Sequence, residues 1–154
     1  MPAAYSKDII KAWEDTVWQD TKIRSFTHEI YPYSLTDNVK TTEDLARMLY
    51  CGEINFVQYF VQRHRVEEQS GTCDEHRYRV QVQYYLQDSG NNQNKIQDFF
   101  EVLDETVVAR LGPSWEGTVT HFFRDETWPT IRFFAEIEGR PVYVGSFTYF
   151  AEVI

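Results

Sequence analysis

The clearest pattern in the sequence is a change of hydrophobic period between residues 54 and 111. Apolar residues are frequent from Ile54 to Val66, and after a charged stretch they alternate with polar residues from Tyr78 to Leu86. After Gly90 the apolar residues recur at helical spacing, and Gly112–Pro113 ends that run. The residues at helical spacing are Ile96, Phe99, Phe100, Leu103, Val107 and Leu111. Alternation predicts strands and spacings of three and four predict a helix, so the segment is predicted to fold as strand, strand, helix.

The flanking segments predict further helices and strands. Before the hairpin, the pattern predicts a helix from Ser6 to about Asp20, a strand over Ile23–Tyr31 and a short helix over Thr42–Tyr50. Pro32 is expected to end the early strand or to confine it to a sheet edge. The last part of the chain predicts strands over Val119–Arg124, Ile131–Ile137 and Val142–Val153, the last two joined by a tight turn at Glu138–Gly139. In the second of these strands, Ile131, Phe133, Ala135 and Ile137 are expected to share one face.

This order of elements predicts a single α+β domain over residues 1–154. The expected fold is a mostly antiparallel sheet with a long β-hairpin, packed against an N-terminal helix and one long amphipathic helix. Each hairpin strand has about a dozen residues and so reaches about 40 Å, well beyond the usual strand. The helix after the hairpin also permits one parallel strand pairing through a right-handed crossover.

Composition narrows the classes of function. The formal net charge is -9, which argues against a protein that tracks nucleic-acid phosphates through basic patches. No apolar run approaches the roughly 18 residues of a membrane span, so a soluble chain without membrane contact is expected. Aromatic residues make up 16% of the chain, a surplus that suits protein interfaces or a Tyr-rich sheet face. Cys51 and Cys73 are too few for a disulfide scaffold.

No spacing of residues in the chain is typical of a catalytic, cofactor or metal site. His64, Cys73 and His76 match no zinc pattern, and we expect no catalytic residue, no cofactor and no metal. The long helix does place several acids opposite its apolar stripe. A solvated helix face is the ordinary explanation for them, because no strongly apolar neighbour on that face would raise a carboxyl pKa for acid catalysis.

The element order resembles that of phage tail terminator proteins and of related neck or tail-completion subunits. The resemblance covers roughly residues 1–125: an N-terminal helix, an over-long hairpin over Ile54–Asp88, an amphipathic helix over Asn94–Leu111 and a returning strand over Val119–Arg124. The short helix at Thr42–Tyr50 and the hairpin at Ile131–Ile154 depart from that plan.

The resemblance implies a structural protein of the virion, assembled in the host cytoplasm into a ring that is usually sixfold. Such a ring caps the tail tube and joins it to the head connector, and DNA passes through it without specific binding. The distal end of the hairpin would then contact the adjacent subunit, although its mixed charges equally suit a solvated tip that discourages aggregation. The interface candidates are Arg63, Arg65, Glu67, Glu68, Asp74, Glu75, Arg77 and Arg79. The candidates for a channel-facing surface that repels DNA are Asp98, Glu101, Asp104 and Glu105.

Two other classes of function fit the same composition. One is a small-molecule-binding domain or enzyme, whose aromatic pocket would be lined by Tyr84, Phe133, Tyr143 and Tyr149 with His121 as a polar group. The other is an acidic adaptor or inhibitor that binds another protein in a salt-dependent manner.

Overall fold

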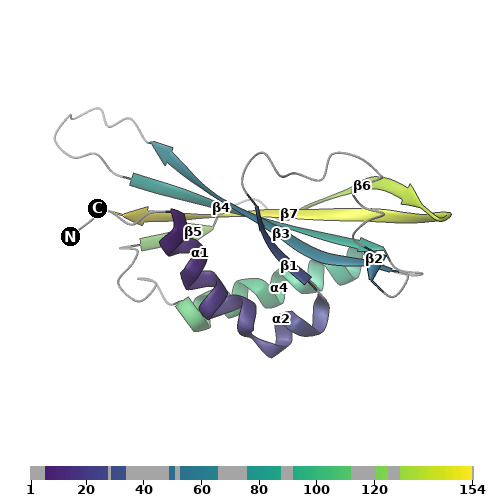
Figure 1. Ribbon diagram of the computed structural model, residues 1–154, viewed down its shortest axis with the longest axis horizontal. Helices are drawn as coiled ribbons and strands as arrows, with labels where there is room; N and C mark the ends of the chain where they lie inside the picture. Colours follow the sequence, from purple (N-terminus) through teal and green to yellow (C-terminus); the bar gives the residue numbers. More distant parts are fainter. Residues whose placement is uncertain are drawn as a thin grey trace.

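Helices cover one face of a mostly antiparallel sheet (Figure 1). The computed structural model describes residues 6–27, 29–33, 49–50, 53–65, 76–87, 92–111, 121–124 and 129–153. The helices are α1 (Ser6–Asp15), the 3-10 helix η1 (Val17–Gln19), α2 (Thr21–Phe26) and α4 (Asn92–Leu111). The strands are β1 (Glu29–Tyr33), β2 (Leu49–Tyr50), β3 (Glu53–Arg65), β4 (His76–Gln87), β5 (His121–Arg124), β6 (Thr130–Ile137) and β7 (Arg140–Val153). The predicted α+β fold is confirmed.

The long hairpin β3–β4 forms the middle of the sheet. The strands follow the order β1-β3-β4-β7-β5, with β2 paired to β3 and β6 paired to β7. The hairpin is paired from Asn55–Leu86 to Arg65–His76, and β7 runs antiparallel to β4 over the whole of β4. Strands β5 and β6 pair with successive parts of the other edge of β7. Strand β7 is therefore covered along both of its edges.

The parallel pairing lies elsewhere than the sequence suggested. Strands β4 and β5, which α4 connects, both run antiparallel to β7. They are therefore parallel to each other, but β7 lies between them. The one directly bonded parallel pair among the described strands is β1–β3. The C-terminal strand β7 thus lies next to β4, in the position where a simple crossover through α4 would have placed β5.

The predicted strand over Ile23–Tyr31 is wrong in its first half. Residues 21–26 form α2, because the Asp20 carboxylate accepts a hydrogen bond from the Lys22 backbone N–H (2.9 Å) and caps the helix, while Ile23 is buried. Strand β1 follows at Glu29–Tyr33 and contains Pro32 at an edge of the sheet, as proline predicts. Of the short helix predicted over 42–50, residues 49–50 are instead strand β2, and the rest lies outside the described residues.

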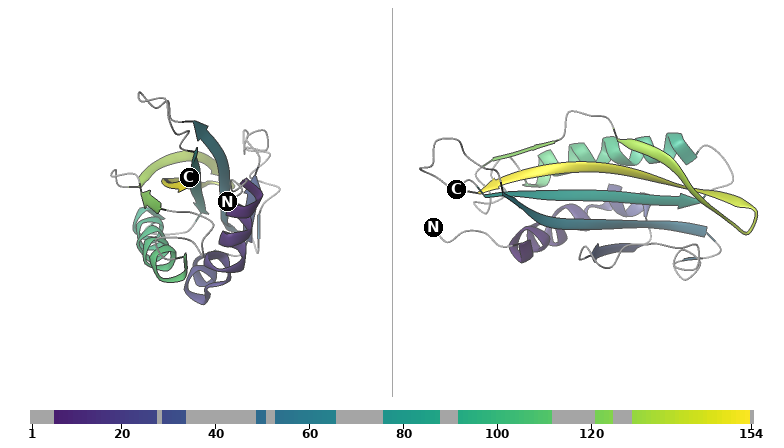
Figure 2. Two further views of the ribbon diagram at one scale, coloured as in Figure 1. Left: turned by 90° about the vertical axis from the view of Figure 1, so that its left-hand side faces the viewer. Right: turned by 90° about the horizontal axis from the view of Figure 1, so that it is seen from above.

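The main core lies between the helices and the sheet. All six residues of the predicted stripe on α4 are buried, which confirms that stripe. The Phe99 ring contacts Tyr84 of β4 (centroids 4.3 Å apart) and Phe26 of α2 (5.9 Å). The same face of β7 carries Tyr149 and Ala151 into this core. Seen end-on, α4 lies under one side of the sheet and α1 with α2 under the other (Figure 2).

The β6–β7 hairpin contributes a second, smaller core on the opposite face of the sheet. Its turn at Glu138–Gly139 has positive φ at both residues (53° and 77°), which confirms the predicted turn. The expected common face of β6 is wrong, because a bulge between Phe133 and Ala135 shifts the alternation. Ala135 and Ile137 are buried in the second core, Ile131 packs against the main core, and Phe133 is 55% exposed.

Candidate functional site: the hairpin and the two flanks of the sheet

The distal end of the hairpin continues as paired strands up to its last described residues. At this end Arg63 lies opposite Tyr78, His64 opposite Arg77, and Arg65 opposite His76. These positions fix the backbone register of Arg63, Arg65 and Arg77, whose side chains are not described. The remaining interface candidates of the tip, Glu67, Glu68, Asp74 and Glu75, lie outside the described residues.

Arg79 differs from the other interface candidates, because its guanidinium is bonded within its own hairpin. It donates a hydrogen bond to Oε1 of Gln62 on β3 (2.8 Å), directly across the strand pair. The contact lies on the sheet face away from the helices, since the neighbouring Tyr78 and Val80 belong to the main core. Arg79 therefore strengthens the hairpin itself.

The four acids of α4 do not form one surface. Asp98, Glu101 and Glu105 are exposed, whereas Asp104 is partly buried and its Oδ1 accepts a hydrogen bond from the Tyr149 hydroxyl on β7 (3.3 Å). This bond turns Asp104 toward the sheet. The remaining acids are spaced three and four residues apart and so form a single row of carboxylates along the outside of the helix.

An exposed apolar side chain lies beside this acidic row. Val108 is 60% exposed, although it follows Glu101 and Glu105 on the outer side of α4. It directly follows the buried Val107, so the helical period places it about 100° around the helix from that residue, outside the buried stripe. Its position in the sequence could therefore have been recognised from the periodicity. Single exposed apolar residues are common on protein surfaces, so Val108 by itself defines no contact surface.

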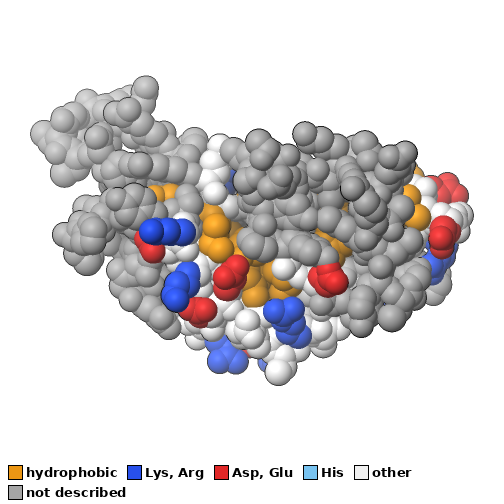
Figure 3. Space-filling model, in the orientation of Figure 1, with side chains coloured by type: hydrophobic (Ala, Val, Ile, Leu, Met, Phe, Trp, Pro, Cys, Tyr) orange, Lys and Arg blue, Asp and Glu red, His pale blue; other side chains and the backbone are white. Residues whose placement is uncertain are grey.

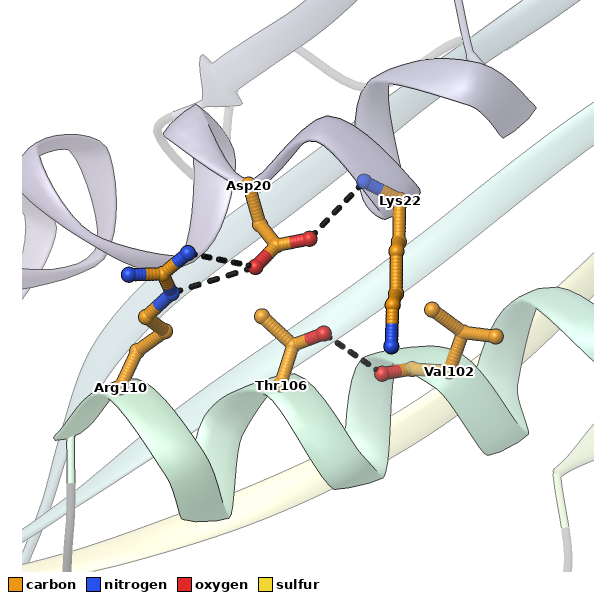
Figure 4. A network of polar contacts seen from close by, with 5 residues as sticks. All are labelled: Asp20, Lys22, Val102, Thr106 and Arg110. Carbon is orange, nitrogen blue, oxygen red and sulfur yellow. Dashed lines mark hydrogen bonds and ion pairs between the residues drawn. The ribbon is translucent and has the colours of Figure 1, made fainter.

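An ion pair holds the N-terminal helices against α4 (Figure 4). Nε and Nη2 of Arg110 both lie 3.1 Å from Oδ2 of Asp20, while Oδ1 of Asp20 caps α2 through Lys22. Burial pushes the pKa of Asp20 upward, but the Lys22 N–H and the Arg110 guanidinium outweigh it, so that the pKa lies below its ordinary value. The pair fixes the relative position of α2 and α4.

Helix α1 is tied to the other side of the sheet. The Tyr59 hydroxyl of β3 donates a hydrogen bond to Oε1 of Glu14 (3.3 Å). Burial and the neighbouring Glu14 carboxylate raise the pKa of that hydroxyl. Because Lys7, Ile10 and Glu14 are spaced three and four residues apart, they lie along one side of α1, next to β3. Lys7 is exposed and Ile10 is half-buried.

The residues proposed for an aromatic pocket pack in separate places. Tyr84 is 2% exposed, contacts Phe99 and donates a hydrogen bond to the Phe26 carbonyl; burial raises the pKa of its hydroxyl. Tyr149 is also buried and packs against Trp13. The other two, Phe133 and Tyr143, contact each other at the β6–β7 hairpin. His121 lies in β5, and its side chain is not described.

The described surface is chemically mixed on the helix side. Figure 3 shows basic and acidic side chains interspersed over the helices on the face that it presents. Within the described ranges, His, Cys, Asp and Glu side chains form no group of three or more that is able to hold a metal ion. None of the helices in those ranges is long and apolar enough to cross a membrane.

No protein-family model matches this chain, and no curated protein matches its sequence. Function is therefore inferred from the fold and from the contacts described above.

Proposed function

We propose that the chain is a structural subunit of a ring-shaped phage tail terminator or neck connector, which joins the tail tube to the head. The observation that carries this proposal is the β3–β4 hairpin, with strands of 13 and 12 residues. A usual strand has five or six residues. The pairing continues past Val61 and Tyr78, the last described core residues on the hairpin, to Arg65 and His76. An arm of this length fits a contact with an adjacent subunit.

The two sides of the molecule also suit a ring. A ring of identical subunits needs two different surfaces that complement each other, one on each side of the subunit. Here β1 and β3 lie on the side of α1, and β5 and β6 lie on the side of α4 (Figure 2). The two sides differ in strand direction and in helix, as a head-to-tail contact requires.

The charge of the chain suits a ring that DNA crosses without binding. With a formal charge of -9 and exposed carboxylates at Asp98, Glu101 and Glu105, the protein repels a phosphate backbone at short range. Asp104 is the exception among the proposed channel residues, because its carboxylate is bonded to Tyr149. Its role is to position α4 on the sheet.

The proposal is tested by removing the hairpin tip. Residues 67–75 are replaced by a short Gly-Ser turn, and light scattering measures the mass of both proteins over a range of concentrations. The expected result is that the intact chain forms a discrete multiple near six, visible as rings by electron microscopy, and that the shortened chain is a folded monomer. Circular dichroism and urea unfolding serve as controls for folding. An intact chain that stays monomeric up to millimolar concentration would contradict the proposal.

A further inference from the structure

Among the described residues, the two outer edges of the sheet carry devices against strand pairing over part of their length. On one edge, β1 carries Pro32, which lacks a backbone donor, and covers residues 56–60 of β3. On the other edge, β6 carries the bulge after Phe133. Prolines and bulges are devices that prevent edge-to-edge pairing. Two stretches have neither device and no outer partner among the described strands: Val61–Arg65 of β3 and His121–Arg124 of β5.

These two stretches lie at the same level of the sheet. Arg63 is opposite Tyr78, Tyr78 is opposite Ala151, and Ala151 is opposite Phe122. Strand β3 runs antiparallel to β4, β4 to β7, and β7 to β5, so β3 and β5 are themselves antiparallel. A second copy placed beside the first at the same height would therefore bring β5 against β3 in antiparallel orientation.

At that register, the residues of the two copies that stand opposite each other carry no like charges. Gln62 would stand opposite Phe123, and Arg63 opposite Phe122. No arginine would stand opposite another arginine, since Arg124 would face Val61. Because the two stretches lie at the same level of the sheet, side chains on one face of the first copy adjoin side chains on the same face of the second copy.

Exposed lysines on α1 and exposed glutamates on α4 lie beside the two edges, although α1 also carries Asp8, Glu14 and Asp15, and Asp15 lies 3.8 Å from Lys11. Trp13 of α1 and Asp104 of α4 both contact Tyr149, which places these two residues at the same level. Lys7 and Lys11 are exposed on α1, one turn apart. Glu101 and Glu105 are exposed on α4, also one turn apart. Each charged pair has an apolar neighbour accessible to solvent on the same helix: Ile10, half-buried, and Val108, 60% exposed.

We infer that neighbouring copies join head to tail, with Val61–Arg65 of β3 in one copy paired to His121–Arg124 of β5 in the next. Helix α1 of the first copy then lies beside α4 of the second, with Lys7 and Lys11 near Glu101 and Glu105. Of the exposed acids proposed for the channel, this contact leaves Asp98 to line it. This inference rests on the proposed ring and names the surfaces that build it. The partner is a second copy of this chain.

Disulfide cross-linking tests the strand junction. In a chain with Cys51 and Cys73 replaced by serine, Gln62→Cys and Phe123→Cys are introduced together. Within one copy, β4 and β7 separate these positions by about 14 Å, too far for an internal disulfide. Oxidation is expected to give a covalent ladder that ends at the mass of the closed ring. The control chain carries Gln62→Cys with Glu136→Cys, which pairs with Pro141 at the other end of the sheet, and is expected to give no ladder.

Charge reversal tests the helix junction. The variant K7E/K11E and the variant E101K/E105K are each expected to weaken self-association about tenfold at low salt, because two attractive pairs become repulsive. The chain that combines both variants is expected to regain most of the lost affinity. A control, K22E/K95E, changes the net charge as much as K7E/K11E does at exposed lysines away from the junction, and is expected to have little effect.

The outcomes separate the inference from the proposed function. Rings that form without the cross-link, and without rescue by the combined charge reversal, overturn the inference and leave the ring proposal standing. A two-fold dimer that joins like edges gives neither the ladder nor the rescue, and overturns the inference as well. A chain that is monomeric at every concentration overturns both. The ladder together with the rescue supports both.

Discussion

Gly145 is expected to be required because α4 packs against the backbone of β7 at this position. A Cβ atom added there would lie 2.6 Å from Cε2 of Phe100 and closer still to Cγ2 of Ile96. Carbon atoms that are not bonded do not approach this closely. Both side chains are buried, with exposed fractions of 3% and 0%, so neither is able to move into solvent.

The substitution Gly145→Ala is therefore expected to destabilise the protein by about 1–2 kcal/mol. Overpacking a core costs about 1–3 kcal/mol. Replacing a strand glycine offsets about 0.5–1 kcal/mol of this, because alanine loses less backbone entropy on folding. Urea unfolding followed by circular dichroism measures the change, and the midpoint should fall while the slope stays constant. For a domain of this size we expect the melting temperature to fall by a few degrees.

A second substitution, at Ile96, tests whether the close approach of this side chain causes the loss of stability. Ile96→Ala removes the atom nearest to the added methyl, so Gly145→Ala should cost less in that background than in the natural chain, by about 0.5 kcal/mol or more. Gly139→Ala is the contrasting control: its Cβ would meet nothing within 4 Å, and its cost of about 1 kcal/mol comes from the positive φ of 77°. A Gly145→Ala protein as stable as the natural chain would refute the close packing of α4 on β7.

Two further substitutions test the main core and the contact between α2 and α4 within one copy. Phe99→Ala should cost about 3–5 kcal/mol in urea unfolding, because it opens a cavity among fully buried rings; a negligible change would mean that this face of α4 is not buried. Asp20→Asn keeps the helix cap but removes the ion pair with Arg110, and should cost about 0.5–1 kcal/mol at neutral pH, since Arg110 is 56% exposed. Because the pKa of Asp20 is lowered in the folded state, its contribution is present above the ordinary value of 3.8 and is lost as the pH falls through the folded pKa. The difference between Asp20→Asn and the natural chain should therefore shrink in acid, and a difference independent of pH would contradict the ion-pair origin.

The parts of the fold that the sequence predicted are those fixed by local periodicity. The helical stripe of α4 and the alternation of β4 each depend on which residues of one element face one core, and that information lies within a dozen or so residues. The turn at Glu138–Gly139 was also predicted, because Gly139 readily adopts a positive φ, although Glu138 also has one (53°), which is uncommon for a residue other than glycine.

The errors have local and non-local causes. The segment that begins at Ile23 alternates weakly, as a strand does, yet Asp20 supplies a helix cap and α4 supplies a surface for Ile23. The bulge after Phe133 contains no glycine to mark it, so the shift of faces in β6 was invisible in the pattern. The insertion of β7 between β4 and β5 pairs residues of β4 and β7 that are 55 (Gln87 and Val142) to 77 (His76 and Val153) positions apart, and no local pattern encodes such a pairing.

The candidate surfaces are harder to predict than the core for a physical reason. A core residue is buried by its own chain, so that the pattern of burial is encoded in the chain. A contact surface between subunits remains in water until the partner arrives and has much of the composition of ordinary surface. On α4 the acids alone have the appearance of a solvated face. Val108, which is 60% exposed, interrupts that face, and it gains a structural meaning only if the inferred contact between copies forms.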